Sequence, residues 1–126
     1  MSRKVFFTHP MIESGLADMQ ALGYDIFCPK QKMTRQEILD ACGPYEAIVC
    51  PNFKVDREVI DAMPDLKIIC SFGAGYDNID FVYARTKGVD VMNTPGANSN
   101  AVAEEVIAMI LAAYRYVVPA DVTTRA

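Results

Sequence analysis

The sequence predicts an α/β protein built on a five-stranded parallel sheet. Three observations indicate this class. Short apolar segments recur along the 126 residues, segments of helical periodicity separate them, and Gly or Pro stands at most boundaries. Because parallel strands need right-handed crossovers, five strands in a chain of this length favour the order 2-1-3-4-5, with helices on both faces of the sheet.

The expected elements alternate from strand to helix along the whole chain. In order, they are a strand over Lys4–Phe7, a helix over Glu13–Leu22, a strand over Tyr24–Cys28, a helix over Thr34–Asp40, a strand over Ala47–Cys50, a helix over Asp56–Met63, a strand over Leu66–Cys70, a helix over Ile79–Thr86, a strand over Val89–Met92 and a helix over Ala101–Val118. No repeat or low-complexity segment interrupts this alternation, so we expect residues 1–126 to form one domain.

Local signals mark the ends of these elements. In the first helix Leu16 and Met19 share a face, and Gly23 ends it. Thr34 and Glu37 have the spacing of a capping box, which opens the second helix. Further breaks are expected at Pro29, Gly43, Pro51, Pro64 and Gly88.

The last predicted helix, Ala101–Val118, is apolar on nearly every side. Ser99 or Asn100 would cap it, and Glu104 and Glu105 lie in its first turns, where the helix dipole favours acids. A helix that is apolar all round is normally buried. We therefore expect it either to fold back on its own sheet or to form a homodimer, including one swapped through residues 101–118.

The composition excludes several classes of protein. With 52% hydrophobic and 22% charged residues the chain should fold, and its net charge of −4 argues against binding to nucleic acid or an anionic membrane. The longest apolar run, Val106–Tyr114, is too short to span a bilayer. The four cysteines lack metal-ligand spacing, His9 is the only histidine, and no secretory signal is present. We expect reduced thiols, no metal site and a cytoplasmic location.

One glycine-containing segment, Gly73-Ala74-Gly75-Tyr76-Asp77-Asn78, is close to the dinucleotide fingerprint G-x-G-x-x-G. It follows the fourth strand rather than the first, Asn78 replaces the third glycine, and the residue 20 positions after Gly73 is Asn93, not an acid. It is therefore not a dinucleotide loop. Two alternatives remain: a tight turn that needs positive φ, or a nest of backbone N–H groups that binds a carboxylate.

Other loops at the carboxyl ends of the strands exclude two further classes. The third and fifth strands end in Cys50-Pro51 and Met92-Asn93, without the Asp and Lys of a phosphorelay receiver, and no phosphate loop of the flavodoxin kind follows the first strand. Cys50 and Cys70 are either a redox pair on adjacent strand ends or buried small hydrophobic residues. His9, at the mouth of the expected crevice, is either structural or catalytic.

Three blocks of sequence resemble one family. They are LKIICSFGAGYDNID at 66–80, KGV at 87–89 and NTPGANSNAVAE at 93–104. Together, at this spacing, they closely resemble the D-isomer-specific 2-hydroxyacid dehydrogenases, which include glyoxylate/hydroxypyruvate reductases and phosphoglycerate dehydrogenase. The resemblance covers essentially the whole chain, and it implies the flavodoxin-like substrate (catalytic) domain of that family.

The resemblance also implies roles for individual residues. Backbone N–H groups of Ala74 and Gly75 would bind the carboxylate of a small 2-oxo or 2-hydroxy acid, with Phe72 and Gly73 in the wall of the site. Asn52 and Phe53 would also line the substrate pocket. Val102 would lie at the nicotinamide side of the cofactor.

In the family a Rossmann domain follows this segment and carries the true dinucleotide fingerprint, together with the catalytic Arg, Glu and His. We expect those residues beyond Ala126, so no catalytic residue is assigned within 1–126. The parent enzyme would use NAD or NADP, whereas the isolated chain would bind no cofactor, bind carboxylates weakly and catalyse nothing. The alternative is a complete, non-catalytic flavodoxin-like binding module or scaffold.

Overall fold

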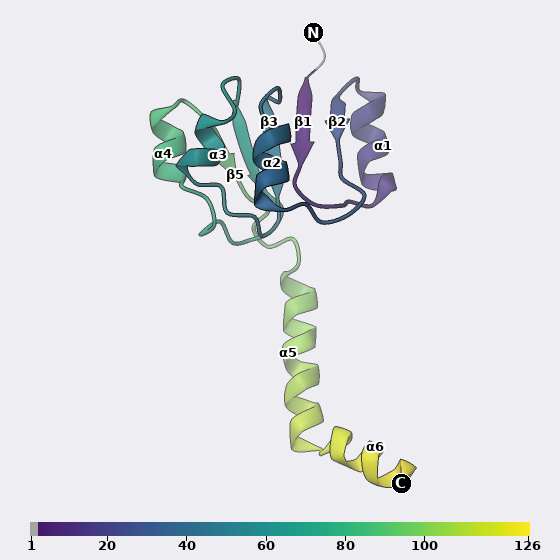
Figure 1. Cartoon of the computed structure of the whole chain (residues 1–126). Coiled ribbons are helices and arrows are strands. Elements are labelled where there is room, and N and C mark those ends of the chain that lie inside the picture. Colours follow the sequence, from purple (N-terminus) through teal and green to yellow (C-terminus); the bar gives the residue numbers. More distant parts are fainter. Residues whose placement is uncertain (1–2) are drawn as a thin grey trace. The chain divides into compact units, whose positions relative to one another are not determined.

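A computed structural model describes residues 3–126 and contains one five-stranded sheet (Figure 1). The strands are β1 (Lys4–Phe7), β2 (Asp25–Phe27), β3 (Ala47–Cys50), β4 (Ile68–Ser71) and β5 (Asp90–Met92). Every neighbouring pair is parallel, and the order is β2-β1-β3-β4-β5. The predicted class and strand order are confirmed. The bounds of β1 and β3 are as predicted, and those of the other strands differ by one or two residues.

Six helices are present among the described residues. They are α1 (Glu13–Ala21), α2 (Arg35–Ala41), α3 (Arg57–Asp61), α4 (Phe81–Thr86), α5 (Ser99–Tyr114) and α6 (Val117–Arg125). Both hydrogen bonds of the Thr34–Glu37 capping box form at the start of α2, which confirms that prediction. The side chains of Asp56 and Asp80 cap α3 and α4 by accepting bonds from backbone N–H groups.

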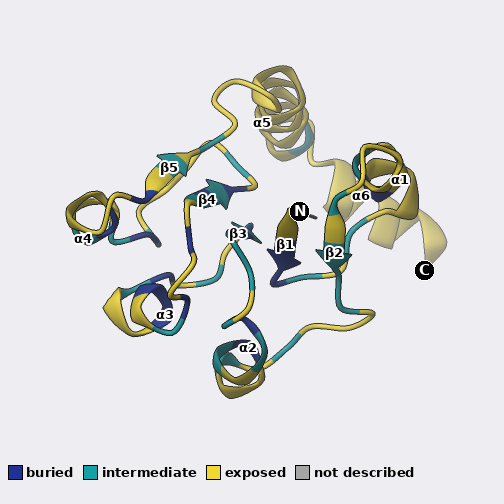
Figure 2. Ribbon diagram, turned by 90° about the horizontal axis from the view of Figure 1, so that it is seen from above, coloured by how far each residue is buried: buried dark blue, intermediate teal, exposed yellow. Residues whose placement is uncertain are grey.

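The two faces of the sheet carry separate apolar clusters. Helices α2, α3 and α4 lie on one face and α1 on the other (Figure 2). Phe6 of β1 belongs to the cluster under α2–α4, whereas its neighbours Val5 and Phe7 pack with Leu16 of α1. This alternation follows from the two-residue period of a strand, in which successive side chains point to opposite faces of the sheet.

The chain divides into two compact units, one reaching to Pro95 and one from Gly96 to Ala126. The first unit contains the whole sheet with α1–α4, and the second contains α5 and α6. The expectation of a single domain stays a prediction.

The second unit corrects the prediction of one helix over Ala101–Val118. Helix α5 ends at Tyr114, Tyr116 adopts a left-handed conformation with φ 53°, and α6 begins at Val117. Pro119 explains the break, because in a continuous helix its ring would clash with the carbonyl of Arg115. The expected cap also differs, since Asn98 precedes α5 and makes no side-chain cap bond, so Glu104 and Glu105 lie beyond the first turn.

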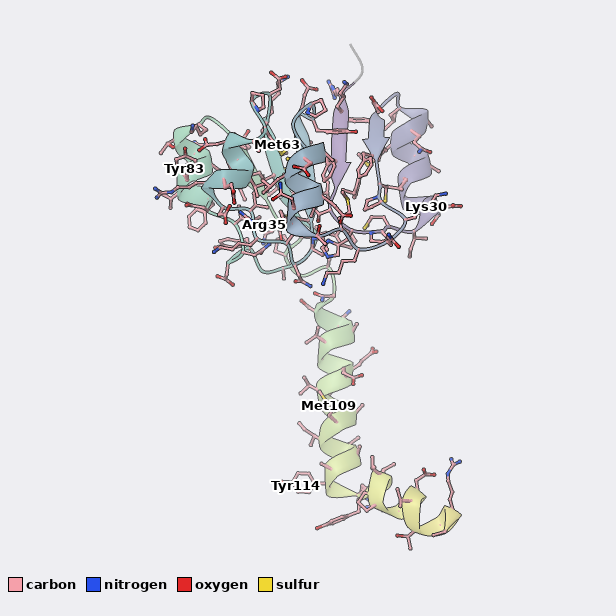
Figure 3. All side chains as sticks on the ribbon, in the orientation of Figure 1. Lys30, Arg35, Met63, Tyr83, Met109 and Tyr114 are labelled. Carbon is pink, nitrogen blue, oxygen red and sulfur yellow. The ribbon has the colours of Figure 1, made fainter. Side chains whose placement is uncertain are left out.

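Helix α5 has no buried residue, and its apolar side chains project along its whole length, Met109 and Tyr114 among them (Figure 3). Within residues 3–126, no helix is both long and apolar enough to cross a membrane.

Candidate functional site

The carboxyl ends of three neighbouring strands bring three loops to one edge of the sheet. Thr8–Pro10 follow β1, Pro51–Phe53 follow β3 and Phe72–Asn78 follow β4. Two further bonds extend the ladders into these loops, from the N–H of Thr8 to the carbonyl of Val49 and from the N–H of Phe72 to the carbonyl of Cys50. In open parallel sheets ligands bind outside this edge.

The carbonyl groups of Gly73, Ala74 and Gly75 all accept hydrogen bonds from other groups of the protein. The N–H of Thr94 donates to the carbonyl of Gly73 at 2.9 Å, and Nδ2 of Asn93 donates to that of Ala74 at 2.8 Å. Oγ of Ser71, only 1% exposed, donates to the carbonyl of Gly75 at 2.7 Å. Three consecutive peptide groups are thereby fixed by their oxygen atoms.

The N–H groups of the same turn are left free. Across the described residues, no acceptor bonds the N–H of Gly73, Ala74 or Gly75, and Ala74 and Gly75 are exposed. Consecutive unpaired N–H groups on a fixed backbone make an anion-binding concavity. A carboxylate is the acceptor that suits them, because its two oxygen atoms each accept charge-assisted bonds.

The glycines of the turn are not required by its backbone. Among the glycines, positive φ occurs at Gly23, Gly88 and Gly96 but at neither Gly73 nor Gly75, so the alternative of a turn that needs positive φ is wrong. A Cβ atom at Gly73 would meet nothing within 4 Å, and one at Gly75 would meet only Oδ2 of Asp77 at 4.0 Å. The turn therefore presents bare backbone next to open space, where a ligand can approach closely.

The loop after β3 is tied to the glycine turn through Asn78. Nδ2 of Asn78 donates to the carbonyl of Phe53 at 2.7 Å, and the carbonyl of Asn78 accepts from the N–H of Val55 at 2.9 Å. The guanidinium of Arg35 lies 6.0 Å from the centre of the half-buried Phe53 ring, and Asn52 is exposed. Asn78, which stands where a dinucleotide loop has its third glycine, thus joins the two loops.

The structure brings together the residues expected to contact a substrate. Phe72 to Gly75 and the pair Asn52 and Phe53 lie on adjacent loops of one edge, and the side chain of Phe72 is 54% exposed. Sequence reasoning missed the residues that fix the turn, which are Ser71 and Asn93. Both stand inside the sequence blocks that carry the family resemblance, but their polarity alone does not reveal which carbonyl they hold.

His9 lies at the same edge, after β1. Its Nδ1 atom is 2.9 Å from Oγ1 of Thr8, and that hydroxyl donates to the carbonyl of Val49 at 3.4 Å. Thr8 is fully buried and His9 is half-buried.

The cysteines do not form a redox pair. In the β3–β4 register Cys50 lies opposite Ser71 and Cys70 opposite Val49, so the two thiols are on opposite faces of the sheet. Burial raises the pKa of the Cys50 thiol to about 12, with a smaller contribution from the charge of Cys70, whose own pKa burial also raises. Protonated thiols are poor nucleophiles, so both act as small apolar residues. Among the described residues, no three His, Cys, Asp or Glu side chains group as metal ligands.

A large hollow in the first unit is not lined by the glycine turn. It has a volume of about 670 Å³ and lies between α1 and β2, lined by residues that include Met11, Leu16, Ile26 and Cys28. A second hollow, about 320 Å³, is lined by Tyr76, Phe81, Val91, Met92 and Asn93. The turn is therefore part of an exposed edge rather than of an enclosed cavity.

The residues present do not fit a dinucleotide. Val102, the residue expected at the nicotinamide side, lies in the first turn of α5 and is 52% exposed. A single valine offers apolar contact but no partner for a pyrophosphate or a ribose. Among residues 3–126, no glycine loop joins the first strand to a helix in the way such a cofactor requires.

The fold is a flavodoxin-like parallel sheet, and the carboxyl edge of that sheet carries a turn with three unpaired N–H groups. The sequence model of the family described as "D-isomer specific 2-hydroxyacid dehydrogenase, catalytic domain" matches residues 5–116. The chain therefore belongs to the D-isomer-specific 2-hydroxyacid dehydrogenase family, and it matches the catalytic domain of that family, as the sequence resemblance indicated.

Individual relatives agree with this family. The D-3-phosphoglycerate dehydrogenase of Archaeoglobus fulgidus is 41% identical over 119 residues, which are 94% of this chain and 22% of that protein. The TT0316 protein of Thermus thermophilus has a TM-score of 0.91 at 26% identity, over 97% of this chain and 40% of the other. The NAD⁺-bound 3-phosphoglycerate dehydrogenase of Entamoeba histolytica has a TM-score of 0.81 at 29% identity, over 91% and 40%. The chain thus spans well under half the length of each of these relatives.

Proposed function

We propose that this chain is the carboxylate-binding half of an NAD(P)-dependent D-2-hydroxyacid dehydrogenase, an enzyme that interconverts small 2-oxo acids and 2-hydroxy acids by hydride transfer. The proposal rests on the turn of residues 73–75. Its three carbonyl groups accept hydrogen bonds from the protein, and its three N–H groups have no acceptor among the described residues. The catalytic-domain match over residues 5–116 supports the reaction class.

In this proposal the protein's own residues bind and orient the substrate. The N–H groups of Ala74 and Gly75 donate to the carboxylate, Phe72 and Gly73 wall the site, and Asn52 and Phe53 lie beside it. Because the carbonyl groups of the turn are fixed, the N–H groups need no rearrangement when the acid arrives, which lowers the entropic cost of binding. The hydride would come from NADH or NADPH held by another part of the parent enzyme.

A titration of the 126-residue chain tests the site directly. Glycolate should shift the backbone amide signals of Ala74 and Gly75 in ¹H–¹⁵N NMR spectra, with a dissociation constant of about a millimolar or weaker. Glycolamide, of nearly the same shape but uncharged, should leave them in place. Equal shifts with both ligands, or none with glycolate, would contradict the proposed site.

The same chain tests the assignment of catalysis to residues outside it. Mixed with NADH and glyoxylate, it should leave the absorbance of NADH at its starting value. Oxidation of NADH at a rate proportional to the concentration of the chain would contradict the half-site assignment. The chain would then contain an acid–base group and a cofactor site that the proposal places elsewhere.

We propose in addition that the chain forms a homodimer through α5. The support lies within the second unit, where α5 is apolar on nearly every side and has no buried residue. A helix of this kind is normally covered by other apolar surface. A dimer swapped through this helix is one form of the same proposal.

A cytoplasmic location completes the proposal. It is supported by four free cysteines, of which Cys42 and Cys50 are buried. Unpaired thiols are the usual state of cysteine in a reducing compartment.

A further inference from the structure

We propose that His9 determines substrate specificity, by hydrogen bonding through Nε2 to a hydroxyl group on C3 of a three-carbon acid whose carboxylate lies on residues 73–75. This inference rests on the proposed carboxylate site and extends it to the other end of the substrate. Its substrate class is the 2-oxo and 2-hydroxy acids that carry a C3 hydroxyl, as opposed to those with a C3 methyl group or no C3.

The imidazole of His9 is held by a short chain of hydrogen bonds. Nδ1 of His9 lies 2.9 Å from Oγ1 of Thr8, and the same hydroxyl lies 3.4 Å from the carbonyl of Val49. The tautomer of the ring decides which atom of the Thr8–His9 pair donates. Since Thr8 is fully buried, the hydroxyl at the base of this chain is fixed by the core.

The other ring nitrogen has no partner in the protein. No described residue forms a hydrogen bond or ion pair with Nε2 of His9, and the half-buried ring lies at the ligand edge of the sheet. Nε2 is an acceptor in one tautomer and a donor in the other. A hydroxyl group suits both, because it donates and accepts, whereas a methyl group would leave this nitrogen without a bond.

The position of His9 in the sheet also favours a ligand contact. Strand order reverses between β1 and β3, since β2 lies on one side of β1 and β3 to β5 lie on the other. Ligands of open α/β sheets bind outside the carboxyl ends of the strands at such a reversal. His9 follows β1 and Asn52 follows β3, so these two residues flank it.

The distance to the glycine turn suits a three-carbon acid. Two steps across the sheet, from β1 to β3 and from β3 to β4, place the loops of His9 and Gly73 about 10 Å apart, at ~4.8 Å a step. With bonds of about 1.5 Å, the imidazole extends roughly 4.5 Å from its Cα and a three-carbon hydroxy acid spans roughly 5 Å from carboxylate to C3 oxygen. With a hydrogen bond of about 2.9 Å at each end, these lengths are enough to cover the separation.

Two ligands that differ in one hydroxyl group test the inference. D-Glycerate has the C3 hydroxyl and D-lactate lacks it, and both carry the same carboxylate. In titrations at one pH and ionic strength, both should shift the amide signals of Ala74 and Gly75. Because His9 is the only histidine, its Cε1–Hε1 signal is assigned without ambiguity, and it should move with D-glycerate and stay in place with D-lactate.

Variants separate a specificity role from a structural one. His9→Phe should weaken D-glycerate binding by about two- to tenfold, the worth of one net hydrogen bond, and leave D-lactate binding unchanged. His9→Gln, which keeps a donor and an acceptor at the end of the side chain, should recover part of that loss. Thr8→Val, which removes the hydroxyl that holds Nδ1, should reduce the preference for D-glycerate in the same direction as His9→Phe.

Each outcome decides between the two proposals. If the turn amides move but the His9 signal does not, or if His9→Phe weakens both ligands equally, the role of His9 is refuted and the carboxylate site stands. If the turn amides move with neither acid, the carboxylate site is refuted, and the role of His9 with it. The variant titrations include the amide spectrum of each protein, so a misfolded variant is recognised directly.

Discussion

Replacing Gly73 by alanine should weaken ligand binding and leave the fold intact or slightly more stable. Gly73 has no positive φ, and a Cβ atom there would meet nothing within 4 Å. Alanine at such a position stabilises by about 0.4–1 kcal/mol, because the unfolded chain loses conformational freedom. For a chain of this size that gain raises the melting temperature by about 1–6 °C.

The same methyl group should harm the anion site. It would occupy the open space beside the unpaired N–H groups, where the proposed carboxylate approaches the backbone. Loss of one hydrogen bond to a charged group costs about 1.5–3 kcal/mol, which corresponds to roughly ten- to 150-fold weaker binding. A D-glycerate titration and thermal unfolding followed by circular dichroism measure the two effects on the same sample.

Two matched variants control for glycine content and for strain. Gly15→Ala adds a methyl group in α1, where nothing lies within 4 Å, so it should stabilise the fold and leave binding unchanged. Gly88→Ala places alanine at φ 74°, so it should destabilise the fold by about 1–2 kcal/mol through strain. If Gly73→Ala binds D-glycerate as tightly as the unchanged chain, or unfolds as easily as Gly88→Ala, the reasoning about the turn is refuted.

Three further predictions concern the support of the site, one ion pair and the second unit. Ser71→Ala should lower the unfolding free energy by about 1–3 kcal/mol and weaken glycolate binding, because the carbonyl of Gly75 loses its donor; unchanged binding would show that the anchor is not needed. Burial favours a raised Asp56 pKa, but hydrogen bonds from Arg35 and Val59 outweigh it and lower the pKa. The stability contributed by this carboxylate is therefore present above its unfolded pKa of about 3.9 and lost as pH falls through the lower folded value. The difference in urea unfolding free energy between the unchanged chain and Asp56→Asn should shrink from pH 5 to pH 3, and a constant difference would contradict the ion pair. In sedimentation the chain should have twice the mass of 13.9 kDa, and Ile110→Glu on α5 should reduce it to 13.9 kDa; a monomer before mutation would exclude the dimer.

The fold could be predicted from the sequence because its signals are local. Each strand is a short apolar run, and residues such as Thr34, Asp56 and Gly23 mark the ends of elements through bonds within a few positions. The misjudged helix over Ala101–Val118 shows where a local signal was overlooked. Apolar periodicity continues through Tyr116, but Pro119 requires a break one turn earlier, at Arg115, and periodicity alone does not contain that steric rule.

The candidate site could be located from the sequence but not built from it. The position of the glycine turn after the fourth strand was enough to place it at the carboxyl edge of the sheet. The carbonyl groups of the turn accept hydrogen bonds from Asn93, which follows β5, and from the buried Ser71 at the end of β4. The sheet register determines which carbonyl each of these side chains reaches. The same limit applied to Cys50 and Cys70, because a one-residue offset in register decides whether two side chains share a face.

In the proposed site, the groups that orient the ligand would add little to the affinity for it. The proposed anion partners are backbone N–H groups, and the nearby cation Arg35 already pairs with Asp56 and Glu58. Partial charges on a fixed turn define where the two carboxylate oxygens lie, but they supply less energy than a full positive charge held in a bidentate pair. A domain built in this way would orient its ligand but bind it weakly. This is the property that a half-site needs if tight binding is to form only when a second surface closes over the acid.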